Sequence, residues 1–298
     1  MKKAILIAPF AFILILQGFS QQTQYVKSVD GVVIAYQVYG NGTMPLIFVH
    51  GWCCDKSYWK EQTSFFKNQY KVVVIDLAGH GESGTGRENY TIQMFANDVT
   101  AVINQLKLNY FILIGHSLGA DVVLETAIKN LEKTLAIFSI DGYGPIPKVK
   151  SKKELITFEK GQRSQWTVKD FQSKVCSLVK GWYHPASDST FMKQIAKNMS
   201  SIDPEVGTDA IINLMLYYYK DYLNSLKSVN TIPVICISST QKPKIKDYRK
   251  LGINLKAIQM DGVSHFLMMS HPVTFNYLLN EQLNKISRSN SNSKVKNY

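Results

Sequence analysis

The sequence predicts an α/β fold with a doubly wound, mostly parallel sheet of eight strands. Short apolar runs rich in Val and Ile recur along the chain, helical patterns separate most of them, and the connections between the two are short. Continuous β-branched runs are typical of strands that are buried on both faces, as in a parallel sheet covered by helices. In such sheets the functional residues lie at the carboxyl ends of the strands.

The first 21 residues are expected to be a signal peptide and not part of this fold. Lys2 and Lys3 precede thirteen consecutive apolar residues, Ala4 to Leu16, and a small or polar segment follows as far as Gln21. This order is typical of a secretory signal, and the apolar run is shorter than the roughly 18 residues of a membrane span. The sequence therefore predicts an exported protein, periplasmic or extracellular, that is cleaved near Ser20. An uncleaved anchor is the alternative.

The eight expected strands begin with a hairpin, because Asp30-Gly31 is a two-residue turn signal between the first two runs. Strands are expected at residues 25–29, 32–38, 46–49, 71–75, 111–114, 135–140, 233–237 and 255–259. Helices are expected between or after them at residues 56–67, 92–106, 118–130 and 272–284.

The segment from about residue 142 to 230 interrupts this alternation. It has no strand pattern, and helical patterns cover residues 154–161, 168–181, 189–199 and 209–226. An insertion of this size at the carboxyl end of the sheet is expected to lie over the site as a lid. The domain is thus expected to cover residues 22–284, and a basic disordered tail is expected at 285–298.

The formal net charge of +12 is concentrated outside the expected sheet. Residues 143–199 hold eleven Lys and Arg against four Asp and Glu, and the chain after Leu283 holds four basic residues and no acid. We interpret the basic insertion as a solvated face, with attraction of anionic substrates or envelope surfaces as the alternative. No nucleic-acid partner is expected.

The four cysteines do not have the spacing of a metal site. Cys236 lies in an apolar strand and is expected to be a small core residue. A disulfide from Cys53 or Cys54 to Cys176 stays open, because export permits one. The sequence also has no glycine-rich dinucleotide loop or P-loop, so neither a metal nor an organic cofactor is expected.

The stretch FILIGHSLGAD, residues 111–121, places one hydroxyl between two glycines. A strand, then Gly115-His-Ser117-Leu-Gly119, then a helix is the pattern of a nucleophile elbow, where a strained turn holds the Ser Oγ clear of the backbone. The two glycines allow the strand and the helix to approach closely. Asp121, in the first turn of this helix, is expected to interact favourably with the positive helix end.

With three further motifs, the chain resembles the α/β-hydrolase family from residue 25 to about 284. The motifs are His50-Gly51-Trp52 after the third strand, DLAGHGES at residues 76–83 after the fourth, and GVSHF at residues 262–266 near the end. The resemblance implies that Ser117 is the nucleophile, that His265 is the base, and that the other histidines are structural.

Acyl transfer also needs hydrogen-bond donors for the oxyanion that develops on the substrate. The backbone N–H of Leu118, at the helix start, supplies one. The resemblance implies that the backbone N–H of Trp52 supplies the second, and the Trp52 ring is expected to form a wall of the pocket.

The carboxylate that orients His265 is harder to predict. Many members of the family have an Asp after the seventh strand, but here Lys242 stands about where it would fall. A minority have the acid after the sixth strand, where Asp141 ends an apolar run, so Asp141 is the expected partner of the imidazole. Asp247 and Asp261 remain the alternatives.

Together these residues predict a serine hydrolase that cleaves a carboxylic ester, esterase- or lipase-like, through an acyl-enzyme. An apolar, aromatic pocket is expected from Trp52, Trp166, Phe171, Trp182, Tyr183 and Tyr217 to Tyr219. Ser in place of Asp at the elbow argues against dehalogenase or epoxide-hydrolase chemistry. The alternatives are lactone, amide or carbon–carbon hydrolysis, perhydrolysis, or a non-catalytic protein that binds a small molecule.

Overall fold

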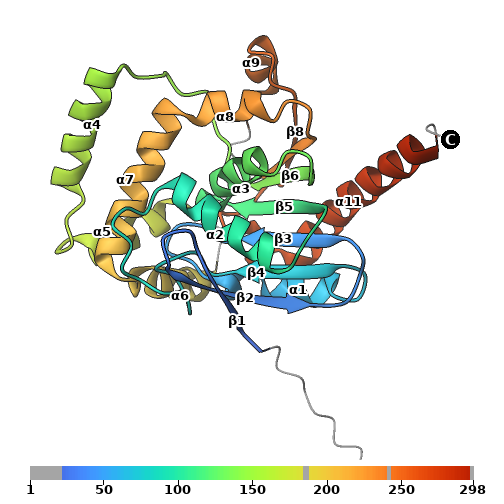
Figure 1. Ribbon diagram of the computed structural model, residues 1–298. Coiled ribbons are helices and arrows are strands. Elements are labelled where there is room, and N and C mark those ends of the chain that lie inside the picture. The colour runs from blue at the N-terminus through green and yellow to red at the C-terminus, as the bar shows by residue number, and fades with distance from the viewer. Residues whose placement is uncertain (1–21, 184–187, 240–242, 296–298) are drawn as a thin grey trace, which may run out of the picture.

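The computed structural model describes residues 22–183, 188–239 and 243–295 (Figure 1). The predicted signal peptide, His184 and Lys242 lie outside these residues. Eight strands form one sheet in the order β1-β2-β4-β3-β5-β6-β7-β8. The first two strands are an antiparallel hairpin, β2 also runs antiparallel to β4, and all other neighbours are parallel. The predicted doubly wound, mostly parallel sheet is therefore confirmed.

Every predicted strand is present. The strands are β1 Gln24–Lys27, β2 Val33–Tyr39, β3 Pro45–Val49, β4 Lys71–Ile75, β5 Phe111–His116, β6 Thr134–Ile140, β7 Val234–Ser238 and β8 Leu255–Gln259. The central strands β3, β5 and β7 are buried along their whole length. Helices cover both faces of the sheet and bury these strands. Continuous apolar runs are typical of strands in such a position.

Helices flank the sheet in two layers. They are the 3₁₀ helix η1 Lys56–Trp59 and the helices α1 Lys60–Phe66, α2 Ile92–Gln105, α3 Leu118–Lys129, α9 Ile245–Lys250, α10 Leu267–Ser270 and α11 Pro272–Val295. α2 packs against α3 on one face of the sheet, and α1 packs against α11 on the other (Figure 1). No helix in the described part of the chain is long and apolar enough to cross a bilayer.

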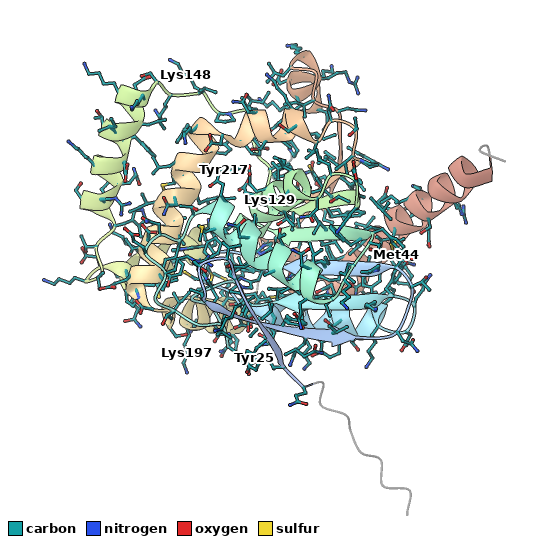
Figure 2. The ribbon with its side chains drawn as sticks, viewed as in Figure 1. Tyr25, Met44, Lys129, Lys148, Lys197 and Tyr217 are labelled. Carbon is teal, nitrogen blue, oxygen red and sulfur yellow. The ribbon has the colours of Figure 1, made fainter. Side chains whose placement is uncertain are left out.

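Between β6 and β7 the described residues form five inserted helices. They are α4 Lys152–Gln165, α5 Phe171–Gly181, α6 Ser189–Ser200, α7 Pro204–Lys220 and α8 Tyr222–Ser228. The inserted segment contacts loops that follow sheet strands, because Trp52 Nε1 donates to Gly207 O and His265 N donates to Trp182 O. Lys148 and Lys197 on this segment are exposed and point outward (Figure 2), as expected for a solvated basic face.

The predicted disordered tail is wrong for most of its length, because α11 continues from Pro272 to Val295. Ile286 is only 7% exposed and packs on the core. Lys285 forms an ion pair with Glu281 one turn earlier, and Ser287 Oγ donates to Leu283 O. Side-chain pairs four residues apart stabilise a helix. These contacts and the burial of Ile286 outweigh the polar composition from which we predicted disorder.

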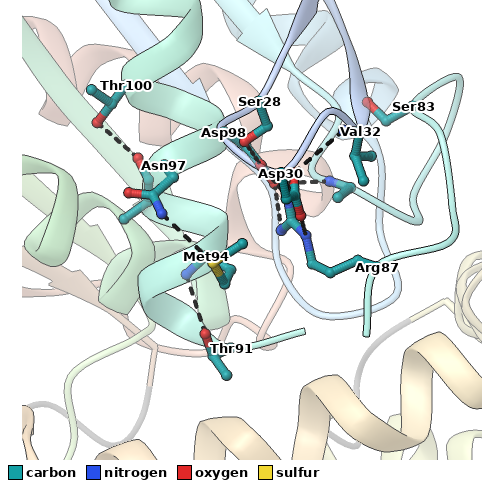
Figure 3. A network of polar contacts seen from close by, with 12 residues as sticks. Ser28, Asp30, Val32, Ser83, Arg87, Thr91, Met94, Asn97, Asp98 and Thr100 are labelled. Atoms are coloured by element: carbon teal, nitrogen blue, oxygen red, sulfur yellow. Dashed lines mark hydrogen bonds and ion pairs between the residues drawn. The ribbon is translucent and has the colours of Figure 1, made fainter. Parts of the chain in front are cut away.

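A buried ion-pair network fixes the β1–β2 hairpin to α2 (Figure 3). The Arg87 guanidinium donates to Asp98 on α2 and, through Nε at 2.7 Å, to Asp30 in the hairpin turn. Asp98 also accepts from Ser28 Oγ at 2.6 Å and from the backbone N–H of Ala78 at 3.2 Å. Its carboxylate is therefore satisfied from three segments of the chain, as a buried charge requires.

Candidate active site

Ser117 lies in the tight turn between β5 and α3. Its φ of 51° is in the left-handed region, a conformation that costs a residue with a side chain about 1–3 kcal/mol and often marks a functional site. A Cβ on Gly115 would lie 2.1 Å from Gly119 O, and one on Gly119 would lie 2.5 Å from His50 O. Only glycine fits at these two positions, so the predicted elbow geometry depends on both.

Asp141 follows β6 directly and contacts His265. Its Oδ2 lies 2.7 Å from His265 Nδ1 although the two residues are 124 positions apart. Asp141 Oδ1 accepts a hydrogen bond from the backbone N–H of Ser239 at 2.7 Å, and Ser239 Oγ donates at 3.0 Å. Burial alone would raise the pKa of Asp141, but the hydrogen bonds from His265 and Ser239 lower it below its ordinary value. The carboxylate is therefore charged at neutral pH.

The His265 ring is held on several sides. The ring of His116 lies 4.7 Å away and that of Trp182 4.9 Å away, centroid to centroid. His116 Nε2 also donates to the His265 carbonyl oxygen at 2.9 Å. The Asp141 carboxylate accepts a hydrogen bond from His265 Nδ1. The neutral imidazole therefore carries its proton on Nδ1, and Nε2 is free to accept a proton. This is the tautomer that a general base needs.

Ser117 and His265 lie on neighbouring segments. Ser117 directly follows His116, and His116 donates to the carbonyl oxygen of His265. Ser117 N donates to Ile140 O at 2.9 Å, so the end of β6 that carries Asp141 is also adjacent. Within the described ranges the Ser117 hydroxyl has no hydrogen-bond partner. The structure thus brings Asp141 and His265 into contact, and it places Ser117 on a neighbouring segment. In many enzymes the hydrogen bond from the nucleophile to its base is long or poorly aligned until substrate binds.

Three other histidines are buried and have lowered pKa values. Burial lowers the pKa of His50 to about 4 and those of His80 and His116 to about 3. His50 Nδ1 donates to Gly51 O at 2.8 Å and its Nε2 accepts from Leu77 N at 3.0 Å. His80 Nδ1 donates to Ala78 O at 2.9 Å. These rings are neutral at pH 7, and their hydrogen bonds to the backbone hold loops in place.

The two expected oxyanion donors lie on segments that adjoin Ser117. Leu118 is the first residue of α3, and the loop that carries Trp52 touches the elbow, because a Cβ on Gly51 would lie 3.3 Å from Ser117 Cβ. Neither backbone N–H, of Leu118 or of Trp52, donates to another residue that the structure describes. Both are therefore available to a substrate oxygen.

The Trp52 ring does not line the pocket beside Ser117. It is buried, it donates through Nε1 to Gly207 O at 2.7 Å, and it packs edge-on against Trp166 at 5.6 Å. Its indole N–H has a partner in the insertion, and Trp166 and Phe171 pack edge-on against the ring. That the ring walls the substrate pocket stays a prediction. The ring joins the insertion to the sheet.

A pocket of about 220 Å³ opens beside the elbow. It is lined by Ser117, Leu118, Asp121, Gly142, Leu214, Met215, Tyr218 and Tyr219. Of the predicted aromatic residues, Tyr218 and Tyr219 contribute to it, Trp182 packs on His265, and Trp166, Phe171 and Tyr217 are buried in the insertion. A larger cavity of about 600 Å³ lies elsewhere, around Lys56 and Asp76.

The other candidate carboxylates do not reach His265. Asp247 lies on α9 beside Lys250 at 3.5 Å, and Asp261 accepts from Gln259 Nε2 at 2.6 Å. Asp121 is buried near Glu125, and burial followed by the charge of that neighbour raises its pKa well above the ordinary value. Asp121 does lie in the first turn of α3, and its favourable interaction with the helix end stays a prediction.

Two further residues support the site. Ser239 follows β7 and binds Asp141, and Trp182 on the insertion packs on His265. Trp182 was predicted only as an aromatic residue of the pocket. Ser239 was not predicted, because a hydroxyl at the end of a strand was its only signal. The disulfide that was left open is not formed, since all four thiols are free and Cys176 is exposed while Cys53 and Cys54 are buried.

Comparisons with known proteins agree with this fold. The family described as alpha/beta hydrolase fold matches residues 44–272. A bifunctional esterase/perhydrolase of Acinetobacter calcoaceticus is 37% identical over 101 residues, which are 33% of this chain and 37% of that protein. A non-heme chloroperoxidase of Burkholderia pyrrocinia is 35% identical over 101 residues, 33% of this chain and 36% of that protein.

A solved structure extends the likeness to the whole fold. A thermophilic esterase from Thermogutta terrifontis superposes with a TM-score of 0.73 at 20% identity, covering 89% of this chain and 99% of that one. The chain spans little more than a third of the length of these two curated relatives. Their names therefore do not show the activity of this protein. The family match covers most of the chain, and with the elbow and the sheet order it shows that this protein belongs to the α/β-hydrolase family.

Proposed function

We propose that this protein is an exported serine hydrolase that cleaves carboxylic esters through an acyl-enzyme. The observation that carries the proposal is the 2.7 Å contact between Asp141 Oδ2 and His265 Nδ1. The strained Ser117 lies on a segment that is hydrogen-bonded to the ends of both of their segments. A carboxylate, an imidazole and a serine in this relation are the parts of a catalytic triad. The esterase named among the relatives supports the ester as substrate.

In the proposed reaction, Ser117 Oγ attacks the ester carbonyl and His265 Nε2 takes its proton. Asp141 stabilises the imidazolium that forms. The backbone N–H groups of Leu118 and Trp52 bind the oxyanion, and each such donor typically contributes a factor of about 10² to 10³ in rate. The imidazolium then protonates the leaving alcohol, and a water molecule activated by the same base releases the acid and restores the serine.

A second reaction, perhydrolysis, is favoured by one specific observation. The relative from Acinetobacter calcoaceticus is named as both an esterase and a perhydrolase. Hydrogen peroxide in place of water would attack the same acyl-enzyme and release a peracid, so the same residues serve both reactions. Lactone, amide and carbon–carbon hydrolysis and a purely binding role compete with these two reactions, but no contact in the described residues favours any of them.

A fluorophosphonate probe tests the nucleophile directly. We expect the probe to form one covalent adduct, which mass mapping of peptides places on Ser117, because the probe traps a serine that an adjacent base activates. The Ser117→Ala variant, which removes only the hydroxyl, is the matched control and should stay unlabelled. Correctly folded protein that takes up no probe would argue for the binding role and against hydrolysis.

Export rests on residues 1–21, which lie outside the described part of the chain. A basic start followed by a short apolar run predicts cleavage. Sequencing of the mature N-terminus from an expressing cell should find a start near Gln21. An intact Met1 in the envelope fraction would instead indicate an uncleaved anchor.

A further inference from the structure

Asp121 is a buried carboxyl that the proposed chemistry does not use. It lies one helical turn after Ser117 on α3 and lines the same pocket of about 220 Å³. Its residue surface is only 5% exposed, and its Oδ1 is buried without a hydrogen-bond partner in the described ranges. Buried side-chain oxygens in proteins nearly always have a partner, so this one needs an explanation.

The polar neighbours of Asp121 already have other partners. Glu125 Oε1, on the next turn of α3, accepts from Tyr217 OH at 2.9 Å and also from Ser225 Oγ. The hydroxyl of Tyr143 donates to Ala120 O at 3.0 Å. The hydroxyls of Tyr143, Tyr217 and Ser225 therefore donate to other acceptors. Asp121 lines the pocket, so a ligand bound there can supply a partner for its carboxyl.

A hydroxyl is the ligand group that suits the Asp121 carboxyl. Burial, followed by the charge of Glu125, raises the pKa of this carboxyl well above the ordinary value. A hydroxyl both donates and accepts, so it can pair with a carboxyl in either protonation state. Leaving such a group unpaired costs about 1–3 kcal/mol. A neutral oxygen of a ligand, which a hydroxyl supplies as both donor and acceptor, would recover that cost.

We propose that Asp121 is a specificity residue that binds a hydroxyl on the acyl group of the substrate. This inference rests on the proposed ester hydrolysis at Ser117. Ser117 and Asp121 line the same pocket, so the hydroxyl belongs a few bonds from the ester carbonyl, as on the third or fourth carbon. The pocket has the volume of about seven water molecules at roughly 30 Å³ each, which suits a short acyl chain.

The remaining lining supports this assignment. Leu118, Leu214 and Met215 give the pocket apolar walls beside Tyr218 and Tyr219. A carbon chain packs against such walls, and the single carboxyl sets the position of the polar group. Pockets of this kind select substrates strongly, because a substrate without the hydroxyl leaves the buried acid unpaired.

The test compares ethyl 3-hydroxybutyrate with ethyl butyrate, which share one leaving group. We expect wild-type kcat/KM to be at least about tenfold higher for the hydroxy ester, the ratio that 1.4 kcal/mol of one hydrogen bond produces. In Asp121→Leu, a change of similar size without hydrogen bonding, this ratio should fall to about one. Asp121→Asn keeps a donor and an acceptor and should retain most of the ratio, and the exposed Asp247→Asn is the surface control.

Binding gives a second measurement that needs no turnover. In the Ser117→Ala variant, calorimetry should find Kd for the hydroxy ester about tenfold below that for ethyl butyrate. Equal Kd values would overturn the inference, and so would a wild-type kcat/KM ratio of one or less. If wild-type protein hydrolyses neither ester while the Kd difference is present, the proposed hydrolysis fails and the role of Asp121 in binding stands.

Discussion

Replacing Asp141 with Asn is expected to lower kcat for ester hydrolysis by a factor on the order of 10⁴, with the fold retained. The Ser239 N–H lies 2.7 Å from Asp141 Oδ1 and would hold the oxygen of the new amide. The amide NH₂ would then face His265 Nδ1, at the position of the present 2.7 Å contact. A donor there favours the tautomer with its proton on Nε2, which cannot accept the proton of Ser117.

The controls are the two carboxylates that competed with Asp141 in the sequence. Asp247→Asn and Asp261→Asn should keep kcat within about twofold, because neither side chain contacts His265. Steady-state kinetics on one nitrophenyl ester measures all three variants. A near-normal rate for Asp141→Asn, with a large loss in either of the others, would show that the base is oriented by a different group.

The loss of folding stability in acid also involves Asp141. Its pKa in the folded protein is below the ordinary 3.8, so the hydrogen bonds to its charged form contribute their full stabilisation above that value. The contribution is lost only as the pH falls through the lowered pKa. Asp141 is therefore charged across the whole pH range in which a histidine base titrates.

Replacing Asp98 with Ala is expected to destabilise the fold by about 3–5 kcal/mol. The change leaves the Arg87 guanidinium, 2% exposed in its side chain, with one partner fewer in the interior. It also removes the acceptor of Ser28 Oγ and of the Ala78 N–H. A buried charge that loses its partner costs this much because no water replaces the partner. Urea unfolding, followed by circular dichroism, measures the free energy of unfolding.

Asp30→Ala is the matched control within the same network. Asp30 also binds Arg87, but its side chain is 23% exposed, so water replaces the lost contact and we expect a change of about 1 kcal/mol or less. Equal losses in the two variants would show that burial does not govern this network. A loss below about 1 kcal/mol for Asp98→Ala would show that the Arg87 charge is solvated or paired in another way.

Most of the fold followed from local patterns. Continuous apolar runs, such as those of β3 and β5, are buried on both faces, and the turn signal at Asp30-Gly31 does form the hairpin. The tail is the exception, because the buried Ile286 and the Lys285–Glu281 pair extend α11 beyond the point where composition predicts disorder. The average polarity of residues 285–298 does not reveal a few specific contacts that stabilise a helix.

By itself the sequence determined the sheet, the insertion after the sixth strand and the elbow at Ser117. Each of these depends on the period of apolar residues or on glycines a few positions apart, and such spacing acts through neighbouring backbone. Only the tertiary structure decided that Asp141 contacts His265, that Ser239 supports this pair, that the Trp52 ring joins the insertion, and that Asp121 is left unpaired in the pocket. These outcomes depend on how strand ends and inserted helices meet in space. Contacts between residues about a hundred or more positions apart leave no trace in local spacing.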